Sequence, residues 1–278
     1  MRVAGPRATL GHVRETRGQT HDDPARAPGR ARARRAAACG ATALALALAL
    51  ALGGCSEDDV RFQYSWDDRR VVCSQSIDNI TQVKPWEDIT EELSRAARRA
   101  SVALFHTHVP GETISMEWLL DVLALADRQG LDFVTYADFA AGAPPRPGLA
   151  LAFDDDAVGA WFALRGILAE RGARVTFFVT KYYSLTDEAR GQLAALAQGG
   201  HSIQAHSVDH LDASAYVAEH GIDAYLADEA VPSLEILRAA GYAPTAYAYP
   251  AGVTTAGLDE AMLEIVEYVR VGPRLCPH

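Results

Sequence analysis

The chain from residue 101 onward alternates between short apolar runs and longer stretches in which apolar residues recur every three or four positions. The short runs, among them SVALFH at 101–106 and ARVTFFVT at 173–180, have the length and residue types of buried strands. The longer stretches, such as SMEWLLDVLALADRQG at 115–130, have the spacing of amphipathic helices. About seven such repeats predict an α/β fold, and they favour a parallel βα barrel over a flat doubly wound sheet.

Polar side chains stand where these predicted strands end. The residues at or just past a strand end are His106, Tyr136, Asp154, Asp155, His206 and Tyr249. In a βα barrel the C-terminal strand ends form one face, and active sites are assembled there. No predicted strand is followed by a glycine-rich phosphate loop, neither G-x-G-x-x-G nor G-K-[ST]. The pattern therefore predicts an active site at this face that does not use a glycine-rich phosphate loop.

The first 54 residues differ in composition from the rest of the chain. An arginine-rich stretch is followed by an apolar run and small residues, the order of a secretory signal. LGGC at 52–55 resembles a bacterial lipobox, in which Cys55 is lipidated and becomes the mature N-terminus. We therefore expect 1–54 to be a basic N-terminal segment and lipoprotein signal peptide, and the protein to be lipid-anchored to a bacterial membrane at the cell envelope, extracytoplasmic. The alternative is an uncleaved membrane anchor over 36–54.

The remaining chain is expected to divide at residue 101. Residues 55–100, beginning with SEDDVRFQYSWDDRR at 56–70, are predicted to be a tether and N-terminal extension, and 101–278 the catalytic domain. Cys73 and Cys276 lie close to the two ends of the mature chain, in a compartment that permits disulfides. They pair if the fold brings those ends together, and otherwise they are two free thiols.

The charge of the chain limits its partners. The formal net charge is −10, and because residues 1–54 contribute +6, residues 55–278 carry −16. Such a surface repels phosphate backbones and other polyanions, which argues against nucleic acid as a partner. It is compatible with neutral or cationic polymers. We predict no protein partner.

Two histidines and a run of carboxylates suggest a metal site. HSVDH at 206–210 places two imidazoles at i and i+4, which on a helical turn lie on one face and can hold one ion. The alternative is a pair of hydrogen-bonded or surface histidines. An aspartate from the run Asp154-Asp155-Asp156 would complete a His₂Asp set with open positions. A divalent cation also explains why carboxylates are crowded there, since one binds it and the next stays ionised as a base.

Taken together, these segments resemble the polysaccharide deacetylase family, also called the NodB homology family or carbohydrate esterase family 4. The family's T-F-D-D motif is here Ala152-Phe153-Asp154-Asp155, and its H-[ST]-x-x-H motif is here residues 206–210. Three further family segments are TFFV at 176–179, G-H-x-I at 200–203 and A-Y-P-x-G at 248–252. The resemblance covers residues 101–271 and implies a distorted (β/α)₇ barrel as a single catalytic domain.

The resemblance also implies residue roles. It makes Asp154 the general base, and it makes Asp155, His206 and His210 ligands of a divalent metal, by default Zn²⁺, with Co²⁺, Ni²⁺ or Fe²⁺ as alternatives. Family members use a histidine acid, usually in a C-terminal L-x-H segment that is missing here. Circularly permuted members place this segment first. In LFHTHV at 104–109 the matching residue is His106, which is therefore the predicted acid.

Several positions depart from the family pattern. Ala152 replaces the threonine of T-F-D-D, and Asp156 replaces the glycine that usually follows. The arginine that orients the base in many members is absent, with Ala246 or Tyr247 near its position. We interpret its absence as subfamily variation, the other interpretation being lowered activity. His108 either supports the site or is solvated.

These features predict a metal-dependent amide hydrolase that removes N-acetyl groups from an N-acetylglucosamine-containing polysaccharide. The backbone N–H near Tyr249 or Ala251 is expected to stabilise the oxyanion. Tyr182 and Tyr183 either stack on a sugar ring or cover the barrel edge. Two alternatives remain. One is a deacetylase or esterase for peptidoglycan, acetylated xylan or a small amide, and the other is a catalytically weakened, lipid-anchored carbohydrate-binding protein.

Overall fold

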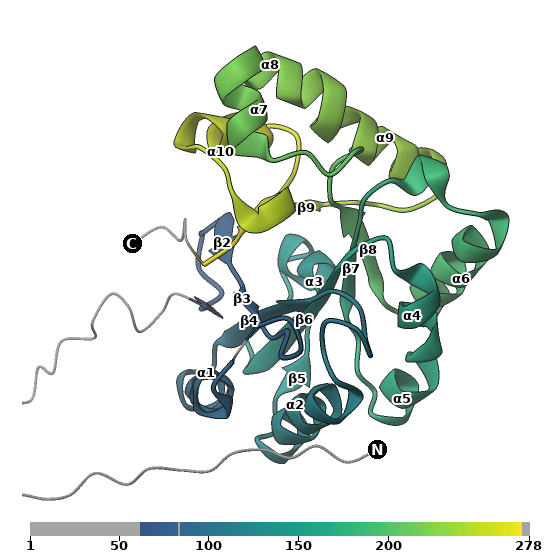
Figure 1. The fold of residues 1–278 in the computed structure, drawn as a ribbon. Coiled ribbons are helices and arrows are strands. Elements are labelled where there is room, and N and C mark those ends of the chain that lie inside the picture. The colour runs from purple at the N-terminus through teal and green to yellow at the C-terminus, as the bar shows by residue number, and fades with distance from the viewer. Residues whose placement is uncertain (1–61, 83, 274–278) are drawn as a thin grey trace, which may run out of the picture. The chain divides into compact units, whose positions relative to one another are not determined.

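The computed structural model describes residues 62–82 and 84–273 (Figure 1). Its strands are β1 (Gln63–Tyr64), β2 (Val71–Cys73), β3 (Gln75–Ser76), β4 (Val102–Thr107), β5 (Asp132–Phe133), β6 (Gly148–Asp155), β7 (Thr176–Val179), β8 (Ser202–Ala205), β9 (Ala246–Ala248) and β10 (Tyr268–Val271). Its α-helices are α1 (Trp86–Arg99), α2 (Met116–Arg128), α3 (Tyr136–Ala140), α4 (Val158–Ala163), α5 (Arg165–Glu170), α6 (Asp187–Gln198), α7 (Ala213–His220), α8 (Ile222–Tyr225), α9 (Val231–Ala239) and α10 (Ala256–Met262).

The described strands form one sheet that almost closes on itself. Neighbouring strands follow the order β1, β4, β6, β7, β8, β9, β10, β2, and only the β1–β4 pairing is antiparallel. β3 follows β2 after a single residue but pairs with β4, near the opposite end of this order. The β2–β3 segment therefore joins the two ends of the sheet into a barrel, with most of the helices outside it (Figure 1). The prediction of a distorted parallel βα barrel is confirmed.

Residues 62–82 and 84–100 belong to this barrel, contrary to the predicted division at residue 101. β1, β2 and β3 pair with β4 and β10, and α1 buries Ile89, Leu93 and Ala96 against the rest of the chain. The sequence gives little warning of this, because β1, β2 and β3 are two or three residues long and hydrophobic periodicity needs longer segments. The described part of the predicted tether therefore completes the sheet.

The core has two layers, because the strands are buried on both faces. In β4, Val102 and Leu104 pack with residues from β1, β2, β6, β7 and β9, and since strands from opposite sides of the sheet meet there, this cluster is the barrel interior. Ala103 and Phe105 pack on the other face with helix residues such as Leu119. This explains why β4 and β6 read as continuous apolar runs rather than alternating ones.

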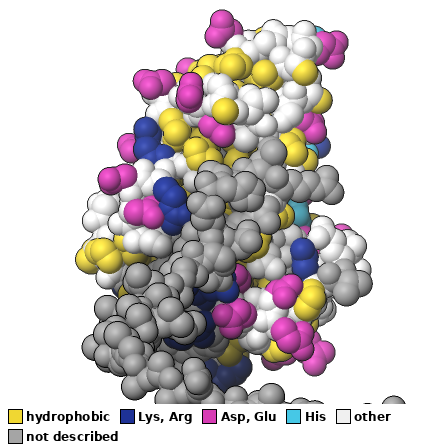
Figure 2. All heavy atoms as spheres, turned by 90° about the vertical axis from the view of Figure 1, so that its left-hand side faces the viewer, with side chains coloured by type: hydrophobic (Ala, Val, Ile, Leu, Met, Phe, Trp, Pro, Cys, Tyr) yellow, Lys and Arg dark blue, Asp and Glu magenta, His cyan; other side chains and the backbone are white. Residues whose placement is uncertain are grey.

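Three further expectations concern the ends and surface of the chain. Cys73 is disulfide-bonded, which excludes the alternative in which it is a free thiol. The other cysteines, Cys39, Cys55 and Cys276, lie outside the described residues. The predicted signal peptide and lipobox also lie outside them. In the part of the chain that the structure describes, no helix has the length and apolar character needed to cross a membrane. Acidic side chains are spread over the face shown in Figure 2, in line with the negative charge balance.

Candidate active site

The period of two along the strands directs several polar side chains into the barrel. His106 follows Leu104 on the inward side of β4, Asp154 follows Ala152 on β6, and Arg270 follows Tyr268 on β10. All three polar residues are buried. Charged and imidazole groups are expensive to bury unless they are paired, so their partners determine what the site can do.

Asp154 and Arg270 form a bidentate ion pair across the barrel. Arg270 Nη1 donates to Asp154 Oδ1 at 3.1 Å and Nη2 donates to Oδ2 at 2.7 Å, and both side chains are 3% exposed. Burial alone raises the pKa of Asp154, but the Arg270 guanidinium and three nearby histidines lower it below its usual value. Asp154 is therefore held as a carboxylate.

Arg270 is one site residue that the sequence analysis does not identify. The orienting arginine is absent from its expected position near Ala246 or Tyr247, yet β10 supplies one from the opposite wall of the barrel. The sequence carries a usable signal, because an arginine within the apolar strand YVRV at 268–271 stands at an inward position and needs a buried anionic partner.

Asp155, His206 and His210 converge on one point. Their closest ligand atoms all lie within 4.8 Å of one another, with Asp155 Oδ1 at 3.0 Å from His210 Nε2 and 3.6 Å from His206 Nε2. His206 Nδ1 donates to the carbonyl of Ala248 at 2.7 Å, which leaves Nε2 facing the carboxylate. Burial raises the pKa of Asp155, but the two histidines beside its carboxyl group hold it well below its usual range.

This donor set fits a divalent cation. Two imidazole nitrogens and one carboxylate oxygen are ligands that zinc and similar transition metals accept, with positions left open for water or substrate. Asp155 Oδ1 is buried, and within the described residues it accepts no hydrogen bond. A buried carboxylate oxygen without a full partner is costly, and a metal ion at this point satisfies it.

The two histidines meet through a bend, not a helical turn. Residues 206–210 are irregular, and Ser207 and His210 have φ values of 65° and 64°. Their imidazole centroids are 5.0 Å apart. The prediction that both rings share one helix face was therefore wrong in its geometry, although the rings do come together.

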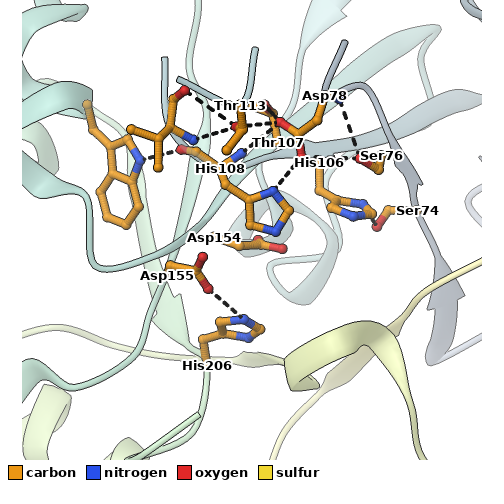
Figure 3. A network of polar contacts seen from close by, with 12 residues as sticks. Ser74, Ser76, Asp78, His106, Thr107, His108, Thr113, Asp154, Asp155 and His206 are labelled. Atoms are coloured by element: carbon orange, nitrogen blue, oxygen red, sulfur yellow. Dashed lines mark hydrogen bonds and ion pairs between the residues drawn. The ribbon is translucent and has the colours of Figure 1, made fainter. Parts of the chain in front are cut away.

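His108 is paired with a buried carboxylate that the sequence did not reveal (Figure 3). Its Nδ1 lies 2.5 Å from Asp78 Oδ2, and the other oxygen of Asp78 accepts hydrogen bonds from Thr107 at 2.6 Å and Thr113 at 2.7 Å. Burial lowers the pKa of His108, but the Asp78 hydrogen bond and surrounding carboxylates outweigh it and raise the pKa to about 9. His108 is therefore an imidazolium at neutral pH.

His106, the predicted acid, has a different environment. Its Nδ1 lies 2.7 Å from the hydroxyl of Ser74, and no carboxylate of the described residues is hydrogen-bonded to the ring. Burial and the nearby Arg270 charge lower the pKa of His106 to about 3. The His106 ring is therefore neutral. Its centroid lies 5.9 Å from that of the His108 ring.

All the predicted catalytic and metal-binding side chains line one pocket. It has a volume of about 410 Å³ and is lined by Ser76, Gln82, Lys84, His106, His108, Asp154, Asp155, His206, His210, Tyr249, Ala251, Gly252, Arg270, Gly272 and Pro273. Figure 3 shows both histidines of β4 and its following loop beside the carboxyl groups of Asp154 and Asp155. The segment that was expected to be an extension supplies one wall of this pocket.

Three singled-out residues lie outside the pocket lining. Tyr182 packs edge-on against Tyr242 with ring centroids 6.2 Å apart, and Tyr183 donates to Asp209 at 2.6 Å. Asp156 is exposed and does not line the pocket. Neither tyrosine therefore lines the pocket that contains Asp154 and Asp155.

The turn at Tyr249–Gly252 forms another wall of the pocket, and its backbone conformation requires a glycine at position 252. Ala251 and Gly252 both have positive φ values, 56° and 67°, and a Cβ on Gly252 would lie 2.6 Å from Gly272 Cα. Only glycine allows the two backbone segments to approach this closely. The backbone N–H of Tyr249 donates to the carbonyl of Arg270 at 3.1 Å, so it is already engaged.

Comparison with known proteins agrees with the motifs. Residues 141–267 match the family model described as "Polysaccharide deacetylase". No curated protein matches the chain.

Three solved structures illustrate the range of structural likeness. A chitin deacetylase from the fungal pathogen Colletotrichum lindemuthianum is 19% identical, with 44% of this chain covering 53% of that one at a TM-score of 0.36. IcaB from Ammonifex degensii is 18% identical over 73% and 84% of the two chains, TM-score 0.42. A de-N-acetylase from Aggregatibacter actinomycetemcomitans is 14% identical over 76% and 93%, TM-score 0.49. The chain thus spans about half the length of the chitin deacetylase.

Proposed function

We infer that this chain, whose residues 141–267 belong to the polysaccharide deacetylase family, hydrolyses N-acetyl groups of an N-acetylglucosamine-containing polysaccharide with the help of a divalent metal. The observation that carries the proposal is the pocket in which Asp155, His206 and His210 converge beside the Asp154–Arg270 pair. Amide hydrolysis needs a polarised carbonyl, a base for the water and an acid for the departing amine. The pocket offers a group for each.

Asp155, His206 and His210 are the proposed metal ligands. A cation bound there, with zinc as the default, would act as a Lewis acid on the acetyl carbonyl and lower the pKa of water. Asp154 is the proposed base, since Arg270 keeps it ionised and fixes its orientation. Its carboxylate would take the proton from the attacking water.

His108 is the proposed acid, in place of His106. An acid must carry a proton at working pH, and the Asp78 carboxylate keeps His108 protonated, whereas His106 is neutral. His108 is 30% exposed and lines the pocket, so it can reach a bound amide. Its proton would pass to the amide nitrogen as the C–N bond breaks.

The oxyanion is proposed to meet a backbone N–H at Ala251. The Tyr249 N–H, the other predicted donor, is engaged by Arg270 O, and residue 250 is a proline without an N–H. Ala251 lines the same pocket as the metal ligands. A fixed backbone donor at this point costs no reorganisation during the reaction.

Localisation and chain order remain parts of the proposal. A lipid anchor on Cys55 would hold the protein at the envelope, where acetylated polysaccharide is available. A circular permutation would account for the histidine acid preceding the base, and β2–β3 joining β10 to β4 supports it. Two observations that favoured the carbohydrate-binding alternative, the missing arginine and Asp156, no longer support it. Arg270 supplies the arginine, and Asp156 lies outside the pocket lining.

We expect the zinc-loaded protein to release acetate from N-acetylglucosamine oligomers, and the chelated protein to release little. Replacing one ligand, His210→Ala, should weaken zinc binding by more than about 100-fold, since loss of a direct ligand costs more than the roughly 10- to 100-fold typical of residues that only orient a ligand. Zinc affinity is measured by competition with a chromophoric chelator, and acetate by an enzyme-coupled assay. Acetate release that is unchanged by chelation would contradict a metal-dependent mechanism. Peptidoglycan and acetylated xylan, assayed in parallel, identify the polymer.

The two histidines can be distinguished by substitution with glutamine. His108→Gln should lower turnover by about 10²-fold because it removes the proton donor, whereas His106→Gln should have a clearly smaller effect. A larger loss in His106→Gln would return the acid role to His106.

The same pair of variants gives a pH signature in metal-free protein. Folding raises the pKa of His108 from 6.5 to about 9, so the folded state binds this proton more tightly. The resulting stabilisation is complete below about pH 6.5 and is lost as the pH rises through 9. Urea unfolding across this range should show that loss in the wild type and in His106→Gln, but not in His108→Gln.

A further inference from the structure

The loop that carries the proposed metal ligand His210 rests on a buried carboxylate from another part of the chain. Glu229 lies in a π-helical turn (Leu226–Ala230) between α8 and α9, and it is 1% exposed. Its Oε2 accepts the backbone N–H of Val208 at 3.2 Å and that of Asp209 at 3.0 Å. These are the two peptide groups that separate His206 and Ser207 from His210.

The opposite side of the same loop is also held. The carbonyl of Val208 accepts the N–H of Lys181 at 2.9 Å, and the N–H of His210 donates to Ser207 Oγ at 2.9 Å. Ser207 and His210 themselves have positive φ values, a conformation that non-glycine residues adopt only when the surroundings fix it. Residues 206–210 form no helix or strand, so side-chain acceptors replace the hydrogen bonds of regular structure.

The burial of Glu229 needs an explanation. An ionised carboxylate is costly to bury, and hydrogen bonds from backbone N–H groups are what compensates it. Within the described residues the bonds found for Glu229 go to Val208 and Asp209. A small change in the orientation of this peptide pair would move the His210 imidazole away from Asp155.

We propose that Glu229 is a positioning residue for the metal site: it fixes the bend at 207–209 and thereby holds His210 at the distance from Asp155 and His206 at which one ion can bind. This inference rests on the proposed metal-dependent function. Glu229 does not touch the ion or the substrate in this scheme. It acts through the backbone of the loop.

Three variants test the role. Glu229→Ala removes the acceptor, and we expect zinc affinity to fall about 10- to 100-fold. Glu229→Gln keeps a carbonyl oxygen that can accept both N–H groups, and its zinc affinity should stay within about threefold of the wild type. Leu234→Ala, a buried residue on α9, is the control for general destabilisation and should leave zinc affinity unchanged. Apparent melting temperatures of all three are recorded in chelator.

A second measurement does not depend on metal. In chelated protein, amide hydrogen exchange at Val208 and Asp209 should be about tenfold faster or more in Glu229→Ala, and close to the wild type in Glu229→Gln. Unchanged exchange and zinc affinity in Glu229→Ala would overturn the inference. So would an equal loss in Glu229→Gln, which would make charge the cause, or an equal loss in Leu234→Ala. If exchange responds as expected but the wild type binds no zinc, the positioning of the loop stands and the proposed function fails.

Discussion

Replacing Asp154 by asparagine is expected to lower the turnover of acetate release by about 10³-fold in folded protein that keeps its metal. The stability of the fold should fall as well, because the buried Arg270 loses its anionic partner. Asparagine preserves the shape of the side chain but cannot accept a proton from water. The proposed metal ligands, Asp155, His206 and His210, are untouched by this change. The loss should therefore fall on turnover, with the zinc affinity of the variant close to that of the wild type.

The matched control for this variant is Asp156→Asn, two residues further along. Asp156 is exposed and outside the pocket lining, so the same loss of charge there should leave turnover within about twofold, as is usual for surface substitutions. Both variants are assayed for acetate release from N-acetylglucosamine oligomers and for bound zinc. Turnover at the wild-type rate in Asp154→Asn would show that another group is the base.

The barrel and part of its site could be predicted because the signals are local. Strands β4, β6 and β7 are runs of four to eight residues, long enough for an apolar pattern to be detected. Asp154, Asp155 and His206 stand at the ends of such runs, and parallel strands bring those ends to one face. The positions of these residues at strand ends were therefore sufficient to predict that they lie close together.

The other part of the site depends on contacts across the barrel, which no local pattern contains. Asp78 follows a two-residue strand and reaches His108 from a segment that lies 30 residues earlier. Arg270 meets Asp154 over a separation of 116 residues. Glu229 is one of many acidic residues in the sequence, and only the fold distinguishes it. In each case the missing information is the closure of the sheet, because it determines which side chains from distant segments face one another.

Arg270→Met is expected to destabilise the folded protein by about 3–5 kcal/mol at neutral pH, the typical cost of leaving a buried charge without its partner. Methionine fills similar space but offers no hydrogen-bond donor to Asp154, which is 3% exposed. In the wild type Arg270 depresses the pKa of Asp154, so the pair stabilises the fold above the unfolded carboxyl pKa of about 3.9. That stabilisation is lost as the pH falls through the folded value.

The direction of the pH effect separates a lost ion pair from a packing defect. Loss of Arg270 raises the pKa of Asp154 relative to the wild type, because burial then acts against a smaller opposing charge, so the variant should regain stability relative to the wild type as the pH is lowered and Asp154 becomes protonated. The double variant Asp154→Asn with Arg270→Met removes both charges and should recover more than half of the loss at neutral pH. Urea unfolding of chelated protein at pH 7 and pH 5 measures both effects. If the double variant is no more stable than Arg270→Met, the cost arises from packing, and the Asp154 carboxylate is not held in its charged state by Arg270.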